Sequence, residues 1–313
     1  MLSGGALNFV SGTLSIVDNF TVGTGGLLGA NVTLDTTRKF TTTATTTIDA
    51  TRTLTIDGGT FSTSALVNNG TLNFLRGILA VTSAGGFNIG TGALGSSVTL
   101  GIGANLQVTN TTTIDPFSQL TLNGGTLTTG ALVNNGTLAF NSGTLAITGV
   151  GGFNIGTGAL GSSVTLGTGA NLQVTNNTTV ATGALLRTTG GNFSGSTLTN
   201  NGTIDHTDGT FNLTGTLTNN AAGRIFVSGL ASPAGAITNA GRITVQNGIG
   251  FLGGAGGITN TGLINGDGTI AKPVTNSGTG ELRAEAGKTL LLTGANGTNT
   301  GKVNLQGGVI EFS

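Results

Sequence analysis

Polar and apolar residues alternate in short runs along most of the chain. Residues 137–140 (Thr-Leu-Ala-Phe) and 144–147 (Thr-Leu-Ala-Ile) show the two-residue period of half-buried β-strands. Between such runs lie turn sequences such as 134–136 (Asn-Asn-Gly) and 141–143 (Asn-Ser-Gly), whose Asn and Gly tolerate a positive φ. Gly and Thr interrupt every window that could carry the apolar spacing of an amphipathic helix. The pattern therefore predicts short β-strands joined by tight turns.

The strands recur in blocks of about 66 residues. Residues 58–114 and 124–180 align without gaps and are identical at 44 of 57 positions. In the C-terminal third a shorter period appears, because an apolar residue followed by Thr-Asn recurs at intervals of 19, 20, 21 and 16 residues. These tripeptides begin at Leu198, Leu217, Ile237, Ile258 and Val274. Three units of about 22 residues make one block, so the two periods agree.

One such unit is too small to offset the ordering of its backbone, which costs ~1–2 kcal/mol per residue, so units must stack on one another. We call each turn of the stack a rung. The sequence predicts one all-β domain over residues 1–313, a right-handed parallel β-helix (β-solenoid) of about 15 rungs of roughly 16–23 residues. Three-rung blocks are expected at about 1–57, 58–123, 124–189 and 190–215, with single-rung repeats over 216–313.

Stacking should place equivalent residues above one another, about 4.8 Å apart. We expect the Asn of each Asn-x-Gly turn to form a ladder of side-chain amides between rungs. The Phe residues that recur with the block should be interior. They are Phe87 and Phe153, Phe74 and Phe140, and Phe9 and Phe20 near the matching N-terminal sites.

Composition supports a folded array. Gly accounts for 59 residues but Pro for only 3, with no G-X-Y period, which argues against collagen. The apolar share of 36% and a formal net charge of zero argue against disorder. Eleven basic residues scattered over 313 positions form no patch for phosphates, so nucleic acid is not an expected partner. No run approaches 18 apolar residues, so no membrane insertion is expected.

The cysteine content and the first residues of the chain give two further expectations. The absence of Cys excludes a disulfide framework and thiolate metal sites. The first residues, Met1-Leu2-Ser3-Gly4-Gly5, lack the basic and apolar regions of a signal peptide. Because repeat sequence follows Met1 directly, we expect this chain to be a segment of a longer protein or a mature region.

Residues 258–270 (Ile-Thr-Asn-Thr-Gly-Leu-Ile-Asn-Gly-Asp-Gly-Thr-Ile) carry a family resemblance. This unit is similar to the repeat of filamentous-haemagglutinin-type adhesins and related autotransporter passengers, and comparable units cover nearly the whole chain. The resemblance implies a β-solenoid that serves as a stalk. It is specific for fold and poor for function, because such stalks support many activities. The secretion cap and membrane barrel of those proteins have no counterpart in this sequence.

Some parallel β-helices are pectinolytic enzymes, which need clustered carboxylates. The best candidate cluster is Asp205 and Asp208, with His206 between them and Arg187 about one rung below. The same stretch, 205–209, is also typical of an exposed turn between two strands, and we favour that interpretation. Asp49 and Asp115 are 66 residues apart, hence about three rungs or ~14 Å, too far to share a water or metal.

Three other features are weak signals. Glu281, Arg283 and Glu285 alternate on one strand face, with Lys288 nearby, which is typical of a solvated face. Residues 265–268 (Asn-Gly-Asp-Gly) faintly resemble a calcium loop, but the nonapeptide array is absent. The Thr tracts at 41–47, 111–113 and 178–179 occur once per three rungs, too sparsely for a regular ice-binding array. The sequence therefore predicts no catalytic, cofactor-binding or metal site.

The expected function is structural and non-enzymatic: a segment of an exported bacterial stalk, fibre or adhesin, secreted or on the cell surface. Its partners would be other copies of itself, joined end to end or laterally, or surface glycans and proteins bound through repeated faces. End-to-end joining would give filaments. The alternative is a carbohydrate-active β-helix enzyme, a polysaccharide lyase or hydrolase.

Overall fold

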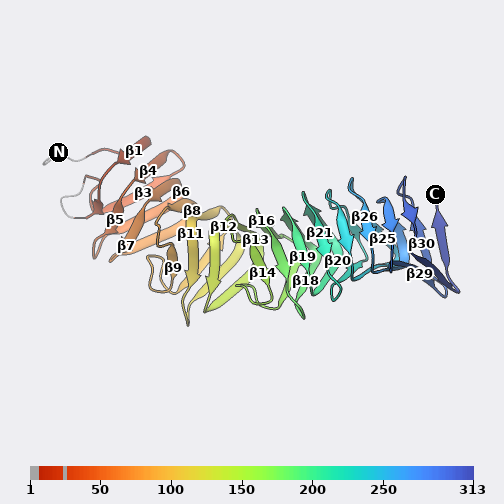
Figure 1. Ribbon diagram of the computed structural model, residues 1–313. Coiled ribbons are helices and arrows are strands. Elements are labelled where there is room, and N and C mark those ends of the chain that lie inside the picture. The colour runs from red at the N-terminus through yellow and green to blue at the C-terminus, as the bar shows by residue number, and fades with distance from the viewer. Residues whose placement is uncertain (1–6, 24–26) are drawn as a thin grey trace. The chain divides into compact units, whose positions relative to one another are not determined.

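Parallel β-strands form the whole regular structure of the described residues. The computed structural model describes residues 7–23 and 27–313, and its strands stack as a β-solenoid of about 13 turns (Figure 1). The expectation about the first five residues lies outside the described ranges. No helix in those ranges is long and apolar enough to span a membrane.

The prediction of an all-β parallel solenoid is confirmed. The predicted number of about 15 rungs, of 16–23 residues each, is too high, because the structure has about 13 turns. Three rungs are longer than expected. Phe20 pairs with Thr46, Phe87 with Thr112 and Phe153 with Thr178, so these rungs take 25 or 26 residues each. Loops between strands use the additional residues, and fewer rungs therefore fit into the chain.

Contacts divide the chain into two compact units, residues 1–149 and 150–313. The boundary falls inside the sequence block 124–189, and the block boundaries remain a prediction from the sequence. The strands of the first unit are β1 Gly12–Ile16, β2 Phe20–Val22, β3 Asn31–Asp35, β4 Arg38–Thr42, β5 Thr45–Ile48, β6 Thr53–Thr63, β7 Ala65–Asn68, β8 Thr71–Val81, β9 Phe87–Ile89, β10 Ser97–Gly101, β11 Ala104–Ile114, β12 Gln119–Asn134 and β13 Thr137–Ile147.

The second unit contains the single-rung repeats. Its strands are β14 Phe153–Ile155, β15 Ser163–Gly167, β16 Ala170–Val174, β17 Thr178–Val180, β18 Leu185–Gly195, β19 Leu198–Asn200, β20 Thr203–Leu213, β21 Leu217–Asn219, β22 Arg224–Val227, β23 Leu230–Ala231, β24 Ile237–Asn239, β25 Arg242–Leu252, β26 Ile258–Asn260, β27 Leu263–Ile270, β28 Val274–Asn276, β29 Glu281–Glu285, β30 Thr289–Leu292, β31 Thr298–Asn299, β32 Lys302–Gln306 and β33 Val309–Phe312.

The core of the first unit is a file of apolar residues stacked from rung to rung. Each member is completely buried and is the register partner of the next, which follows from the two-residue period of the strands. The rings of Phe40 and Phe61 stack within this file, with centroids 5.5 Å apart. Burial of one such side chain contributes about 2 kcal/mol. The file consists of Phe40, Phe61, Leu79, Leu106, Leu127 and Leu145.

The expectation of interior Phe residues is confirmed for Phe20, Phe87 and Phe153, which are buried. It is wrong for Phe9, Phe74 and Phe140, which are only half-buried. On one side the first half of β8 pairs with β6, but on the other side β11 pairs only with residues 77–81. The ring of Phe74 therefore lacks a covering strand on that side, and Phe140 stands at the same place in the repeat.

Backbone conformation repeats with the 66-residue block. Gly58, Gly124 and Gly190 have φ of 99°, 93° and 103°, a left-handed conformation that favours glycine. The same interval relates Thr51, Phe117 and Gly183, with φ of 65°, 64° and 78°. We call the turn between two strands of a rung a corner. The positive φ is therefore a property of this corner, and in two of the three copies a residue other than glycine adopts it.

Candidate functional site

The predicted Asn ladder is present in the second unit, beneath the sheet formed by the Leu/Ile/Val-Thr-Asn tripeptides. Each Asn side chain donates from Nδ2 to Oδ1 of the Asn one rung further on, at 2.6–2.7 Å. All but the last member are at most 1% exposed. The ladder fixes the register of consecutive rungs, because a slipped strand would leave buried amides unpaired. Its members are Asn200, Asn219, Asn239, Asn260, Asn276 and Asn299.

In the first unit the Asn-x-Gly turns behave differently. The Nδ2 of Asn68 donates to the carbonyl oxygen of Ala93 at 2.8 Å, and its Oδ1 accepts from the amide of Gly70 at 3.1 Å. Its register partner in β5 is Ile48, which offers no side-chain amide. An Asn ladder needs Asn at the same position of consecutive rungs. The rung before Asn68 has Ile48 at that position, so no ladder forms there.

A file of threonines lies on the outer side of the same sheet of the second unit. The central residue of each tripeptide is Thr, and the register places these residues in line over consecutive rungs. Four of them are exposed, namely Thr238, Thr259, Thr275 and Thr298. Sequence reasoning missed this file because it considered Thr tracts and overlooked the Thr inside each tripeptide. Its members are Thr199, Thr218, Thr238, Thr259 and Thr275 of the five tripeptides, with Thr179 before them and Thr298 after them in the same register.

The Thr tracts themselves face partly inward, which the sequence did not predict. The hydroxyls of Thr42, Thr46 and Thr63 lie 2.9–3.0 Å from one another and are buried. Thr112 and Thr129 form a similar pair at 2.9 Å. These inward hydroxyls satisfy one another inside the solenoid, whereas the buried hydroxyls of Thr41 and Thr178 have no hydrogen-bond partner.

The structure separates the candidate cluster around His206. Arg187 and Asp205 are register partners, as expected, and form an ion pair at 2.6 Å on the outer surface. Residues 203–213 form the strand β20 with an irregularity near Asp208, so the prediction of an exposed turn at 205–209 is wrong. Along a strand successive side chains point to opposite faces, and His206 accordingly points inward, where it is 1% exposed.

Inside the solenoid, His206 is held by two hydrogen-bonding partners. Its Nε2 lies 2.9 Å from the carbonyl oxygen of Leu230, and its Nδ1 lies 2.7 Å from the hydroxyl of Thr188. A carbonyl only accepts, so Nε2 carries the proton and Nδ1 accepts from Thr188. Burial lowers the pKa of His206. The imidazole is thus a neutral core group, separated by the strand from the carboxylates of Asp205 and Asp208.

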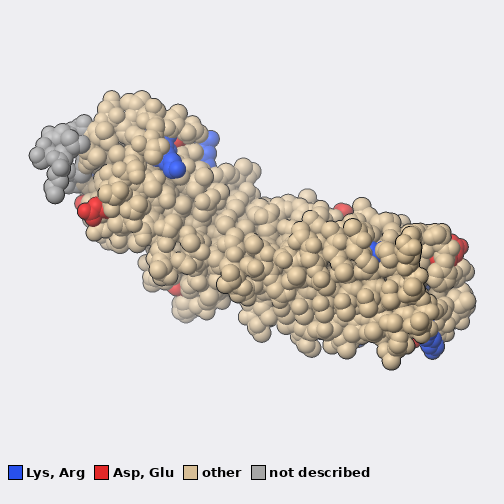
Figure 2. Space-filling view, turned by 45° about the horizontal axis from the view of Figure 1, so that its top comes forward, with Lys and Arg blue, Asp and Glu red and all other residues tan. Residues whose placement is uncertain are grey.

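Of the other carboxylates that the sequence singled out, Asp267 and Glu285 line one cavity, whereas Asp115 and Glu281 are engaged separately. Asp115 accepts from the amide and the hydroxyl of Thr91 at 2.9 and 2.8 Å, and these bonds lower its pKa. Glu281 forms an ion pair with Arg283 at 2.8 Å. Nowhere in the described ranges do three or more His, Cys, Asp or Glu side chains gather so that they could hold a metal. The face in Figure 2 shows the same sparseness, with isolated charges on a largely uncharged surface.

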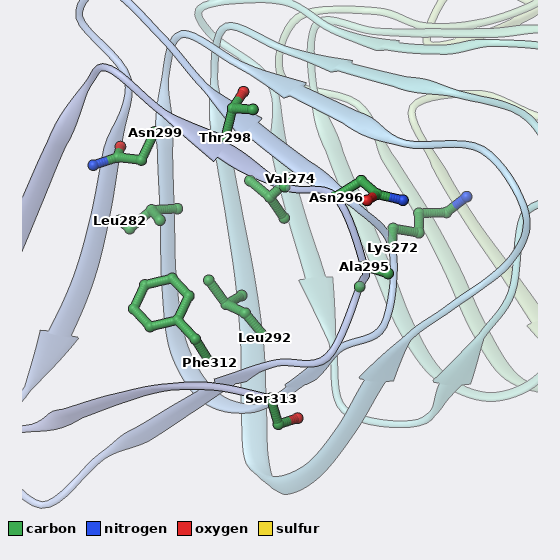
Figure 3. Close-up of a pocket in the computed structure, with 12 residues that line it drawn as sticks. Lys272, Val274, Leu282, Leu292, Ala295, Asn296, Thr298, Asn299, Phe312 and Ser313 are labelled. Atoms are coloured by element: carbon green, nitrogen blue, oxygen red, sulfur yellow. The ribbon is translucent and has the colours of Figure 1, made fainter.

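A cavity of about 360 Å³ opens beside the last rungs (Figure 3). Its apolar lining includes Val274, Leu282, Leu292 and Phe312. Lys272 also borders it, but the side chain extends away from this apolar group in the view of Figure 3. Its Nζ donates to two main-chain carbonyls, of Gly256 at 2.8 Å and of Gly235 at 3.0 Å.

The buried Lys272 connects three consecutive rungs and contributes no free charge to the cavity. The side chain is fully buried, and this burial lowers the pKa of its ammonium group. The charge of Lys272 is therefore directed away from the apolar part of the cavity lining.

The comparisons with known proteins are sparse. No protein-family model matches this chain, and no curated protein matches its sequence. Among solved structures the chain is similar to the crystal structure of a TibC-catalysed, hyper-glycosylated fragment of TibA. The identity is 18%, the match covers 96% of this chain and 97% of that chain, and the TM-score is 0.33. A likeness at this level assigns neither an activity nor a partner to the chain.

Proposed function

We propose that this chain is a non-enzymatic structural segment of an exported bacterial surface stalk, fibre or adhesin. The observation that carries the proposal is the separation of His206 from the carboxylates beside it in the sequence. Strand alternation places His206 inside and the neighbouring carboxylates outside, while Asp115 and Glu281 are engaged by donors in their own surroundings. A repeating solenoid of this kind provides length and repeated faces for weak multivalent contacts.

Display on a bacterial surface tests the positive side of the proposal. The chain is fused to an outer-membrane anchor, and the cells are compared with cells that carry the anchor alone at equal expression. We expect increased settling of the cells or increased attachment to glycan- or protein-coated surfaces. Equal settling and attachment of both strains would contradict the proposed adhesive role.

A polysaccharide digestion assay tests the enzymatic alternative. The purified chain is incubated with neutral and uronate-containing polysaccharides, and new reducing ends and unsaturated products are measured. We expect neither. Cleavage that disappears in Asp205→Asn or Asp208→Asn would establish the lyase or hydrolase alternative instead. Either substitution should leave adhesion of the displayed chain unchanged.

A finer form of the proposal is end-to-end association. Leu305 and Phe312 in the last rung are 61% and 66% exposed, and Phe312 also lines the cavity of about 360 Å³. Unpaired strand edges with apolar side chains template further strands. A second copy of this chain could therefore continue the stack.

A further inference from the structure

A notch interrupts the outer surface of the second unit where one rung is shorter than its two neighbours. Strand β27 has 8 residues, whereas β25 before it has 11. Val245 pairs with Gly266 and Gly250 with Gly268, so residues 246–249 bulge out opposite Asp267 alone. On the other side, residues 284–289 lie opposite only residues 266–267. The corners of the two longer rungs therefore form walls, and β27 forms the floor.

The notch encloses a cavity of about 140 Å³, enough for several water molecules but smaller than the pockets of drug-sized ligands. Four ionisable residues line it, in a chain that has only 22 Lys, Arg, Asp and Glu in all. They are two cations and two anions, so the lining has no net formal charge. These four residues are Arg242, Asp267, Glu285 and Lys288.

The floor of the notch is a hydrogen-bonded network of buried polar groups. Thr244 is 7% exposed and Asn265 is 1% exposed, and the hydroxyl of Thr244 donates to Oδ1 of Asn265 at 2.8 Å. Nε of Arg242 donates to the same Oδ1 at 3.1 Å and to the Thr244 hydroxyl at 2.9 Å. Nδ2 of Asn265 donates to Oε1 of Glu285 at 2.7 Å. The network thereby fixes the orientation of both charged side chains before any ligand arrives.

Each charged group retains capacity for a ligand. Within the described part of the chain, neither Arg242 nor Lys288 takes part in an ion pair. Asp267 uses Oδ1 to accept from the amide of Thr289 at 3.1 Å, while its Oδ2 lies toward the corner at Gly248. The notch thus offers two carboxylate oxygens as acceptors and the outer nitrogens of Arg242 and Lys288 as donors. Val245 is the one side chain among the lining residues that is apolar.

We infer that this notch binds one neutral sugar unit. Sugar hydroxyls donate and accept, which matches a lining that contains both kinds of group in a small volume. A metal cation is disfavoured by the adjacent Arg242 and Lys288, and an anion by Asp267 and Glu285. The inference goes beyond the proposed stalk function, because it assigns a ligand to one rung and requires neither adhesion nor assembly.

Saturation-transfer NMR on the full chain tests the inference with glucose, galactose, mannose and N-acetylglucosamine. A ligand of this size in an open notch should bind with a Kd on the order of 1 mM. We expect Asp267→Asn and Glu285→Gln to weaken binding about tenfold or more, because each removes a charged hydrogen-bond acceptor. Asp208→Asn is the matched control, since it neutralises an exposed carboxylate near a strand irregularity outside the notch, and should bind like the unmodified chain.

Three results would overturn the inference. One is the absence of transfer to any of the four sugars at about ten times that Kd. Another is unchanged binding in Asp267→Asn and Glu285→Gln, with circular dichroism showing intact folds. The third is stronger binding of glucuronate or of the zwitterion glycine betaine, because the notch would then select charge. All three readouts are independent of settling or attachment, so they do not depend on the proposed surface role.

Discussion

Glu281 is the most strongly perturbed carboxyl on the outer surface of the second unit. Hydrogen bonds from Arg283 and Asn304 lower its pKa to about 2. A carboxyl whose folded-state pKa lies below its ordinary value stabilises the fold above that ordinary value, and this stabilisation is lost as the pH falls through the folded-state pKa. The window for Glu281 therefore extends from about pH 4.5 down to about pH 2.

We predict that Glu281→Gln lowers the free energy of unfolding at pH 7 by ~1 kcal/mol, after allowance for solvent screening of a partly exposed pair. The difference from the unmodified chain should begin to shrink near pH 4.5 and be largely lost near pH 2. Urea unfolding at several pH values measures it, with Glu311→Gln near the C-terminus as a charge-matched control. A difference that is constant across this pH range would contradict the assignment.

Phe117 is a corner residue whose side chain the fold does not use. It is fully exposed and has a φ of 64°, in the left-handed region, at the position where the next block carries Gly183. We predict that Phe117→Gly leaves the stability unchanged or raises it by up to ~1 kcal/mol, since relief of strain offsets the greater freedom of glycine in the unfolded chain. Ile102→Gly, at an exposed position without positive φ, should lower the melting temperature instead.

At the scale of the elements, the Asn ladder adds side-chain hydrogen bonds to the backbone pairing of strands β19, β21, β24, β26, β28 and β31. Asn239 stands in its middle, accepting from Asn219 and donating to Asn260. We predict that Asn239→Leu lowers the free energy of unfolding by about 3 kcal/mol, because one buried donor and one buried acceptor are left unpaired. Asn220→Leu, whose half-exposed amide bonds outside the ladder to Asn201, should cost less than ~1 kcal/mol.

The repeat made the ladder predictable from the sequence. The tripeptides at Leu198, Leu217 and Ile237 recur at rung intervals, and their alternation places Asn inside and Thr outside. The burial of His206 was less accessible, because its direction depends on the register irregularity near Asp208, and the turn-like residues around it suggested exposure. Local residue types indicate where a chain can turn, whereas strand pairing decides whether it does.

The notch was beyond sequence reasoning for a related reason. Asp267 and Glu285 were each visible as charged residues, but on separate strands. Only the register shows that β27 is shorter than β25 and that the corners on both sides project beyond it. A deletion inside one repeat is therefore a signal for a pocket, provided that the pairing of the neighbouring rungs is known.

At the scale of the whole molecule, the decisive question is whether copies of this chain continue one another's stack. The cavity of about 360 Å³ beside the last rungs is lined by the exposed ring of Phe312 and by the largely buried side chains of Leu292 and Val274. Covering this surface with a second copy would remove apolar area from water and pair strand edges at the same time. Association should then strengthen with protein concentration and should resist salt, because the lining is mostly apolar.

We predict that light scattering coupled to size-exclusion chromatography shows a molar mass that rises above 30.5 kDa as the concentration of this chain increases. Phe312→Asp should reduce the association at least tenfold, because a carboxylate would be desolvated in the contact. Val150→Asp, a matched change at a residue that is 96% exposed, should have no effect. A strict monomer at all concentrations, or equal association of Phe312→Asp, would leave the solenoid as a spacer that acts singly, since its apolar surface would then not recruit another copy.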